Sequence, residues 1–164
     1  MIKTTRVKNR RTLHFESMQD VVDDVIHLDS SQVRALGNWT PAQILQHVAK
    51  MINFSIDGFP AKAPLLLRIA GKMLRNRSMT KGFQPGFKFS RKFAFLEPAP
   101  DIEWDEALTY LRESIGRLQN ERMTARSPVF GPLTHAQWEK MHCRHAEMHF
   151  SFLSVNGGTP APIG

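Results

Sequence analysis

Apolar residues recur at helical spacing in four stretches of this 164-residue chain, each with a polar face opposite the apolar stripe. The four stretches are residues 17–28, 40–57, 102–122 and 134–155. Thr40 and Thr134 are each followed three residues later by glutamine, which is the pattern of a capping box at a helix start. Pro41 also suits the first position of a helix. The pattern therefore predicts an all-α fold.

A further helix and a long connection lie between the second stretch and the third. Residues 63–77 predict an amphipathic helix whose polar side is basic. Residues 78–100 contain Gly and Pro breakers, and we expect them to form a long, largely extended crossover. Phenylalanines alternate there at strand spacing, at Phe87 and Phe89 and again at Phe93 and Phe95, but the segment is too isolated to form a sheet. Four substantial helices with one long connection predict a four-helix bundle, in which inward-facing side chains form the functional sites.

Length and composition favour one domain without a membrane span. A content of 41% hydrophobic and 23% charged residues is ordinary for a globular protein. We expect a single domain over residues 1–155 and a flexible tail over residues 156–164, which are rich in Gly and Pro. No run approaches the roughly 18 apolar residues of a transmembrane helix, and no export signal is evident. The single Cys143 excludes an internal disulfide, so a cytoplasmic location is expected.

The formal net charge of +7 is concentrated in two segments that contain no acid. Residues 62–96 hold nine Lys or Arg and residues 1–11 hold five more, while all 15 acidic residues lie elsewhere. Such segments attract nucleic acid, acidic lipid or a small anionic substrate, although a solvated basic face needs no partner. No nucleic-acid motif accompanies the charge, so a nucleic-acid partner is not expected. Candidate residues for binding an anionic substrate or surface are Arg68, Lys72 and Arg75.

Histidines provide the main chemical signal, because four of the seven lie between His135 and His149. His145 and His149 are four residues apart and share one helix face. His47 lies on the apolar stripe of residues 40–57, so we expect it to face inward and meet that pair. Three imidazoles suit Zn, Ni, Fe or Co and leave a coordination position open for water or substrate, as in catalytic sites. His142 lies on roughly the same face and is expected to support the ligands.

The same histidines also permit a structural interpretation. A pair four residues apart can be two partly buried side chains with satisfied nitrogens, and His47 can be a core histidine. Cys143 and Glu147 each lie two positions from His145 on the opposite helix face, so neither is chosen as a general base. The tryptophans are expected in the core rather than around a ligand: Trp39, Trp104 and Trp138.

Several short passages carry a family resemblance that covers residues 10–153. The passages are Arg-Arg-Thr-Leu at 10–13, Gly-Asn-Trp-Thr-Pro-Ala-Gln-Ile-Leu-Gln-His at 37–47, Asp-Gly-Phe-Pro at 57–60, Ser-Pro-Val-Phe-Gly-Pro-Leu-Thr at 127–134 and Arg-His-Ala-Glu-Met-His at 144–149. On these passages the chain resembles the DinB/YfiT-like superfamily of metalloenzymes, in a branch defined as a domain of unknown function. The resemblance implies an antiparallel four-helix bundle with a metal held by His47, His145 and His149.

The resemblance also implies a class of reaction. Characterised relatives include enzymes that transfer or isomerise with low-molecular-weight thiols, and many members have no known reaction. We therefore expect a divalent ion, most often Zn or Ni, that activates a small thiol or water for transfer to, or hydrolysis of, a small substrate. The alternative is a non-catalytic binding module that uses the basic helix at an anionic membrane or ligand. Whether the chain forms a homodimer stays open.

Overall fold

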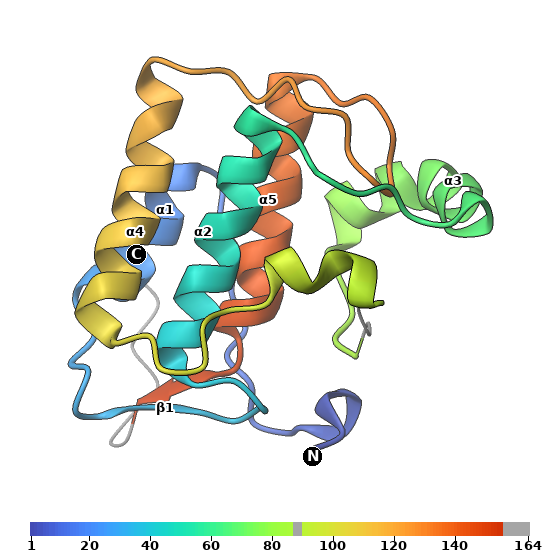
Figure 1. Ribbon diagram of the computed structural model, residues 1–164. Helices are drawn as coiled ribbons and strands as arrows, with labels where there is room; N and C mark the ends of the chain where they lie inside the picture. The colour runs from blue at the N-terminus through green and yellow to red at the C-terminus, as the bar shows by residue number, and fades with distance from the viewer. Residues whose placement is uncertain (87–89, 156–164) are drawn as a thin grey trace.

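The computed structural model describes residues 1–86 and 90–155, and this part of the chain is mainly helical with one two-stranded sheet (Figure 1). The α-helices are α1 (Met18–Ile26), α2 (Pro41–Asp57), α3 (Leu65–Lys81), α4 (Trp104–Gly116) and α5 (His135–Phe150). Short 3-10 helices cover Thr4–Arg6, Arg91–Leu96 and Arg117–Gln119. Strand β1 (Val33–Ala35) pairs antiparallel with β2 (Leu153–Val155). The expectation of a mainly helical fold is confirmed.

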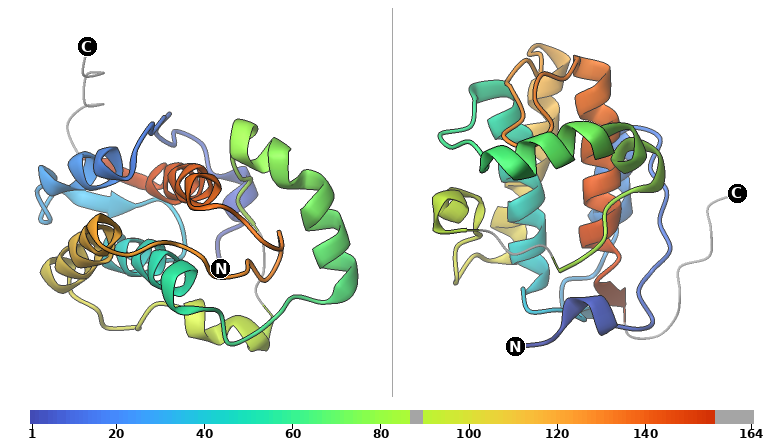
Figure 2. Two further views of the ribbon diagram at one scale, coloured as in Figure 1. Left: turned by 90° about the horizontal axis from the view of Figure 1, so that it is seen from above. Right: turned by 90° about the vertical axis from the view of Figure 1, so that its right-hand side faces the viewer.

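Four of the helices surround one apolar core (Figure 2). Each contacts two of the others, in the order α1, α4, α2 and α5 around the core. The apolar stripes supply side chains with no exposed surface, among them Val21, Leu45, Leu111 and Phe150. Burial of a side chain of this size contributes about 1.5–3 kcal/mol, so the stripes hold these helices together. No helix in the described part of the chain is long and apolar enough to span a membrane.

Capping boxes set the starts of three helices. At Ser17, Thr40 and Thr134 the hydroxyl accepts a hydrogen bond from the backbone N–H three residues later, and the side chain there accepts one from the cap N–H. The reciprocal bonds satisfy backbone donors that a helix start otherwise leaves unpaired. The predicted starts of α2 and α5 are therefore confirmed to the residue.

Several predicted helix ends are wrong. The helix predicted over 102–122 ends at Gly116 and is followed by the 3-10 helix Arg117–Gln119. The helix predicted over 134–155 ends at Phe150, because residues 153–155 pair with β1 instead of continuing the helix. Helix α3 continues past its predicted end at residue 77 to Lys81. It ends there because Gly82 adopts a φ of +74°, a left-handed conformation that glycine reaches without strain.

The crossover is also less extended than predicted. Phe93 and Phe95 lie in the 3-10 helix Arg91–Leu96 rather than in a strand. No strand of the described residues lies beside this segment, and the backbone N–H groups of Phe93 and Glu97 donate to carbonyls three residues earlier. Phe93 is buried and packs with Ala63 and Leu96 in a small separate core. The other alternating phenylalanines, Phe87 and Phe89, and the predicted tail over 156–164, lie outside the described residues.

Candidate metal centre

The rings of His47, His145 and His149 meet where α2 and α5 pack together. Their candidate ligand atoms all lie within 4.8 Å of one another. The ring centroids are 4.5 Å apart for His145 and His149, 4.6 Å for His47 and His149, and 5.2 Å for His47 and His145. The two helices run in opposite directions, so the second turn of α2 lies level with the last turns of α5 (Figure 1). The structure therefore brings together the three predicted ligands.

A backbone carbonyl fixes the ring of His47. Its Nδ1 donates a hydrogen bond of 2.8 Å to the carbonyl oxygen of Leu96. The proton is thereby placed on Nδ1 and the lone pair on Nε2. Histidines that bind metals commonly make such a bond through the nitrogen that does not bind the ion. The end of the crossover thus orients one candidate ligand, a role for Leu96 that the sequence did not indicate.

Burial keeps the three rings neutral. His47 is completely buried, and His145 and His149 are half-buried. Burial lowers the pKa of His47 to about 4. Burial, together with the charge that neighbouring histidines would carry, lowers the pKa of His145 and His149 well below the ordinary value. Neutral imidazole is the form that binds a metal ion.

One ring nitrogen of this cluster is buried without a partner. Nδ1 of His145 makes no hydrogen bond with any of the described residues. A buried polar atom left in this way costs roughly 1–3 kcal/mol. Coordination of a cation by these rings would offset this free-energy cost. Imidazole donors fit a divalent ion that is intermediate between hard and soft. Imidazole suits Zn, Ni, Cu and Fe, whereas Mg and Ca prefer oxygen ligands.

The site contains no acidic donor among the described residues. The groups whose charges shift the pKa values of these three rings are other histidines and Lys50. An ion held by three neutral nitrogens keeps its full double charge, which attracts an anionic fourth ligand. A divalent ion in this donor set would therefore attract anionic molecules.

Two aromatic side chains flank the histidines. The ring of Trp39 stacks on His149, with centroids 5.6 Å apart and planes at 16°, and lies 4.8 Å from His47. Phe83 meets His145 edge-on at 6.0 Å. Trp39 packs against the core, as expected, and its contacts with two of the histidines are an addition that the sequence did not predict. Its position directly before the N-cap of α2 was the sequence signal that could have indicated this contact. The core placement predicted for Trp104 and Trp138 is confirmed.

His142 is buried and has partners outside the three converging rings. Its Nε2 is 3.0 Å from the Ser55 hydroxyl, and its ring stacks on Trp138 at 5.2 Å and 15°. Burial lowers its pKa to about 3. It is close enough to influence the pKa of His145, but its hydrogen bond and ring contact are with other residues. These contacts place it behind the cluster, beside the core.

The remaining candidates on α5 have structural partners. Cys143 is buried in the core, and burial raises the pKa of its thiol to about 12. The Glu147 carboxylate accepts a 2.7 Å hydrogen bond from the Phe15 backbone and pairs with Arg144 at 3.0 Å. These contacts hold the N-terminal segment on α5. Both side chains are therefore engaged away from the histidines, as their spacing predicted.

The predicted anion-binding residues occupy a different surface, on α3. Arg75 donates a 3.4 Å hydrogen bond to the Pro132 carbonyl, and Lys72 is exposed. Arg68 lines a hollow of about 210 Å³ with Lys62 and Arg126. Within the described residues, the hydrogen bonds and ion pairs of these side chains do not involve the three histidines. Their predicted role toward a metal-bound substrate therefore has no support from these contacts.

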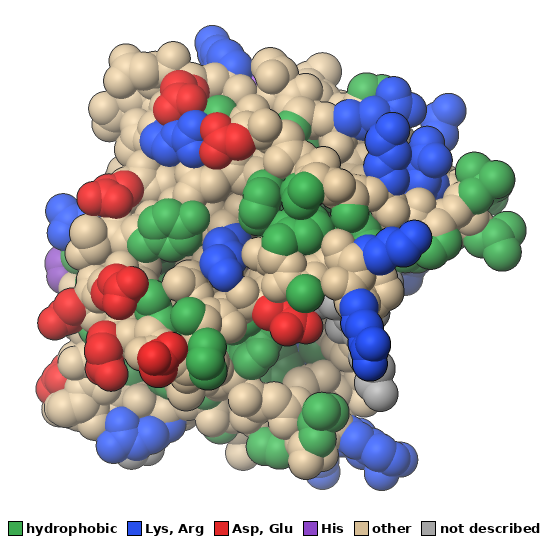
Figure 3. Space-filling model, in the orientation of Figure 1, with side chains coloured by type: hydrophobic (Ala, Val, Ile, Leu, Met, Phe, Trp, Pro, Cys, Tyr) green, Lys and Arg blue, Asp and Glu red, His purple; other side chains and the backbone are tan. Residues whose placement is uncertain are grey.

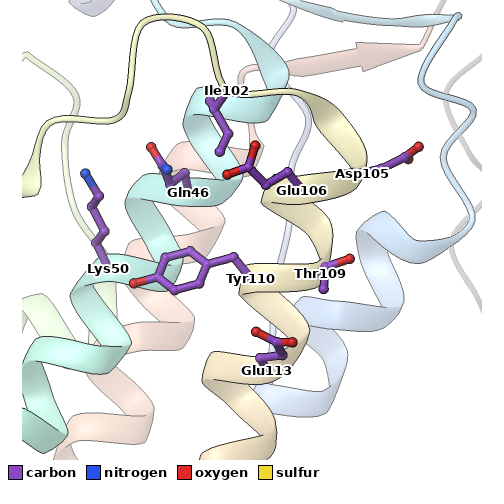
Figure 4. A pocket seen from close by; sticks show the side chains of 8 residues that line it. All are labelled: Gln46, Lys50, Ile102, Asp105, Glu106, Thr109, Tyr110 and Glu113. Atoms are coloured by element: carbon purple, nitrogen blue, oxygen red, sulfur yellow. The ribbon is translucent and has the colours of Figure 1, made fainter.

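A larger hollow, of about 600 Å³, opens between α2 and α4 (Figure 4). Its lining residues are Gln46, Lys50, Ile102, Asp105, Glu106, Thr109, Tyr110 and Glu113. Gln46 accepts a hydrogen bond from the Ala99 backbone, and Lys50 donates one to the Glu97 carbonyl. Two of its polar groups thus hold the crossover against α2. The hollow contains none of the converging histidines, so we place the candidate chemistry at the histidine cluster.

Comparison with known proteins identifies a family without a known reaction. No match was found among curated proteins or among solved structures. A family model described as protein of unknown function (DUF1569) matches residues 7–156, which include all three histidines. This match does not itself connect the chain to the DinB/YfiT-like superfamily. Because it covers most of the sequence, the chain belongs to the DUF1569 family.

Proposed function

We propose that this chain is a metal-dependent enzyme with a DinB-like four-helix bundle, in which His47, His145 and His149 hold one divalent ion. Zinc or nickel is the expected ion, because imidazole nitrogens suit both. The observation that carries the proposal is the convergence of three neutral imidazoles within 4.8 Å of one another. The bond from His47 to the Leu96 carbonyl supports it, since metal-binding histidines commonly make such a bond through the nitrogen that does not bind the ion.

The reaction we propose is either transfer of a small thiol to a small electrophilic substrate or hydrolysis of that substrate by water. An ion held by these rings would lower the pKa of a thiol or water beside them and so supply a nucleophile at neutral pH. The protein's own groups bind and orient the reactants. The Leu96 carbonyl holds the His47 ring in place, and the rings of Trp39 and Phe83 pack against His149 and His145. The neutral donor set favours an anionic cosubstrate.

Native mass spectrometry of untagged protein, with and without a chelator, tests the metal. We expect about one equivalent of a transition metal per chain, removed by the chelator. His149→Ala should weaken zinc binding at least about tenfold. His27→Ala is the matched control, because His27 is exposed at the end of α1, and it should leave binding unchanged. Less than a few tenths of an equivalent, with none taken up on titration, would refute the proposal.

A second measurement tests the reaction separately. Zinc-loaded protein is mixed with a low-molecular-weight thiol and a chromogenic electrophile, and with a chromogenic ester for the hydrolytic reaction. We expect a rate above that of free zinc, lost in His149→Ala and kept in His27→Ala. If the protein binds zinc but accelerates neither reaction, it is a metal-binding protein and the proposed enzymatic function is refuted.

A further inference from the structure

Helix α3 packs on the rest of the molecule through the side that carries Leu67, Gly71, Arg75 and Met79, and this side does not include most of its exposed apolar residues. Gly71 is its buried residue, and a Cβ there would lie 2.5 Å from Val129 Cγ1 and 2.7 Å from the Val129 carbonyl oxygen. Only glycine permits this approach. Arg75, one turn later, donates to the Pro132 carbonyl. These contacts fix how the helix is turned about its axis.

This orientation turns the apolar side of α3 toward solvent. We define the α3 stripe as Leu65, Leu66, Ile69 and Met73, which are between 51% and 83% exposed. At about 100° per residue these four side chains lie within an arc of about 100° on the helix surface. Other exposed large hydrophobic side chains in the described residues are Met1, Ile2, Ile26 and Leu74. The stripe is therefore a concentrated apolar surface, which marks an interaction site.

Cations border the α3 stripe on both sides. Arg68 and Lys72 lie along one edge by helical spacing, and Arg77 and Lys81 lie along the other. None of the four forms an ion pair within the described residues. The sequence contains no acid between residues 57 and 97. Figure 3 shows Lys and Arg beside hydrophobic side chains at the edge that α3 forms, whereas most acids in this view lie over the opposite side.

We propose that α3 docks on a membrane surface that contains anionic lipids. The α3 stripe would enter the boundary between headgroups and acyl chains, and the flanking cations would meet lipid phosphates. Lys62 and Arg126, which share a hollow with Arg68, extend the basic surface beyond the helix. A second copy of the chain fits less well, because a two-fold contact through this helix would set the same unpaired cations against each other.

Co-sedimentation with phospholipid vesicles tests the proposal. The protein, in EDTA so that metal binding plays no part, is mixed with vesicles of phosphatidylcholine alone or with about one third phosphatidylglycerol. We expect binding to the anionic vesicles that is at least about tenfold stronger than to the neutral ones. Leu66→Ser with Met73→Ser should weaken binding at least about tenfold, because it removes apolar surface that enters the boundary. Both side chains are at least 80% exposed, so the fold is retained, as circular dichroism verifies.

Two matched triple variants distinguish the effect of the α3 cations on vesicle binding from the effect of net charge. Arg68→Gln with Lys72→Gln and Arg77→Gln should weaken binding about a hundredfold, at roughly 1 kcal/mol per cation. Three exposed cations away from α3 provide the control: Arg34→Gln, Arg112→Gln and Arg122→Gln. Equal losses in both triple variants, or no binding to anionic vesicles, would overturn the proposal. So would a dimer in sedimentation equilibrium that Leu66→Ser dissociates, which would assign the stripe to a second copy.

Discussion

Acid should destabilise the metal-free protein through His142. This side chain is 1% exposed, between the Trp138 ring and the Ser55 hydroxyl. Burial lowers its pKa from 6.5 to about 3, so the ring stays neutral in the folded protein at pH values where the unfolded chain takes up a proton. A histidine whose pKa is lower in the folded state loses stability as the pH falls below its unfolded value. The loss continues until the pH reaches the folded value.

The size of this loss follows from the two pKa values. Each pH unit costs about 1.4 kcal/mol once the unfolded state binds one more proton than the folded state. From pH 7 to pH 5 the cost at His142 is therefore about 2 kcal/mol, a substantial part of an ordinary total of about 5–15 kcal/mol. Asp24 and Glu147 act in the opposite direction, because burial raises the pKa of both carboxyl groups. A variant is needed to isolate the histidine.

Urea unfolding at pH 7 and pH 5 in EDTA, followed by circular dichroism, measures this cost. Wild-type protein is compared with His142→Gln, whose amide can still reach Ser55 but does not titrate. The free energy of unfolding of the wild type should fall by about 2 kcal/mol more than that of the variant between the two pH values. Equal pH responses would show that His142 does not remain neutral inside the fold, and the reasoning from burial would be refuted.

Three further changes test the packing around the site. Cys143 is 2% exposed and its thiol pKa is raised to about 12, so a thiol reagent at pH 8 should label the urea-unfolded protein but not the native one, and native labelling would contradict its burial. Thr40→Ala should lower the free energy of unfolding by about 1 kcal/mol while Thr40→Ser keeps it, and identical urea curves would count against the cap of α2. Gly71→Ala should cost about 1–3 kcal/mol, because the added methyl group meets the Val129 backbone. Gly116→Ala, with no atom near the new Cβ, should instead stabilise α4 by up to about 1 kcal/mol; equal effects of the two glycine changes would argue against the close approach of α3.

The starts of the helices could be predicted because capping is local. The hydroxyl at Thr40 or Thr134 and the glutamine that completes its box are three residues apart, so the sequence alone contains the whole motif. Where α5 ends depends instead on β1, a strand more than a hundred residues earlier that pairs with β2. The hydrophobic periodicity of a segment does not indicate such a long-range contact. The apolar residues of β2 also continue the helical pattern past Phe150.

The candidate ligands were predictable for a related reason, and their surroundings were not. The apolar stripes of α2 and α5 give the direction of His47 and of the pair on α5. Leu96 acts through its backbone carbonyl, which every residue possesses, so no residue type marks it. The positions of Leu96 and Phe83 depend on the path of the crossover, where Gly and Pro leave no periodic pattern.

Why residues so distant in sequence meet can be argued from the lengths of two helices. Helices α2 and α5 contain 17 and 16 residues and run in opposite directions, so a residue near the start of one is level with a residue equally near the end of the other. His47 is seven residues into α2, and Phe150 ends α5 five residues after His145, so the two histidines lie about one residue apart in height, or roughly 1.5 Å. His149 lies one turn further along the same face. The apolar stripes turn the three rings toward one another, and the capping boxes fix where each helix begins, so both features are needed for the rings to converge.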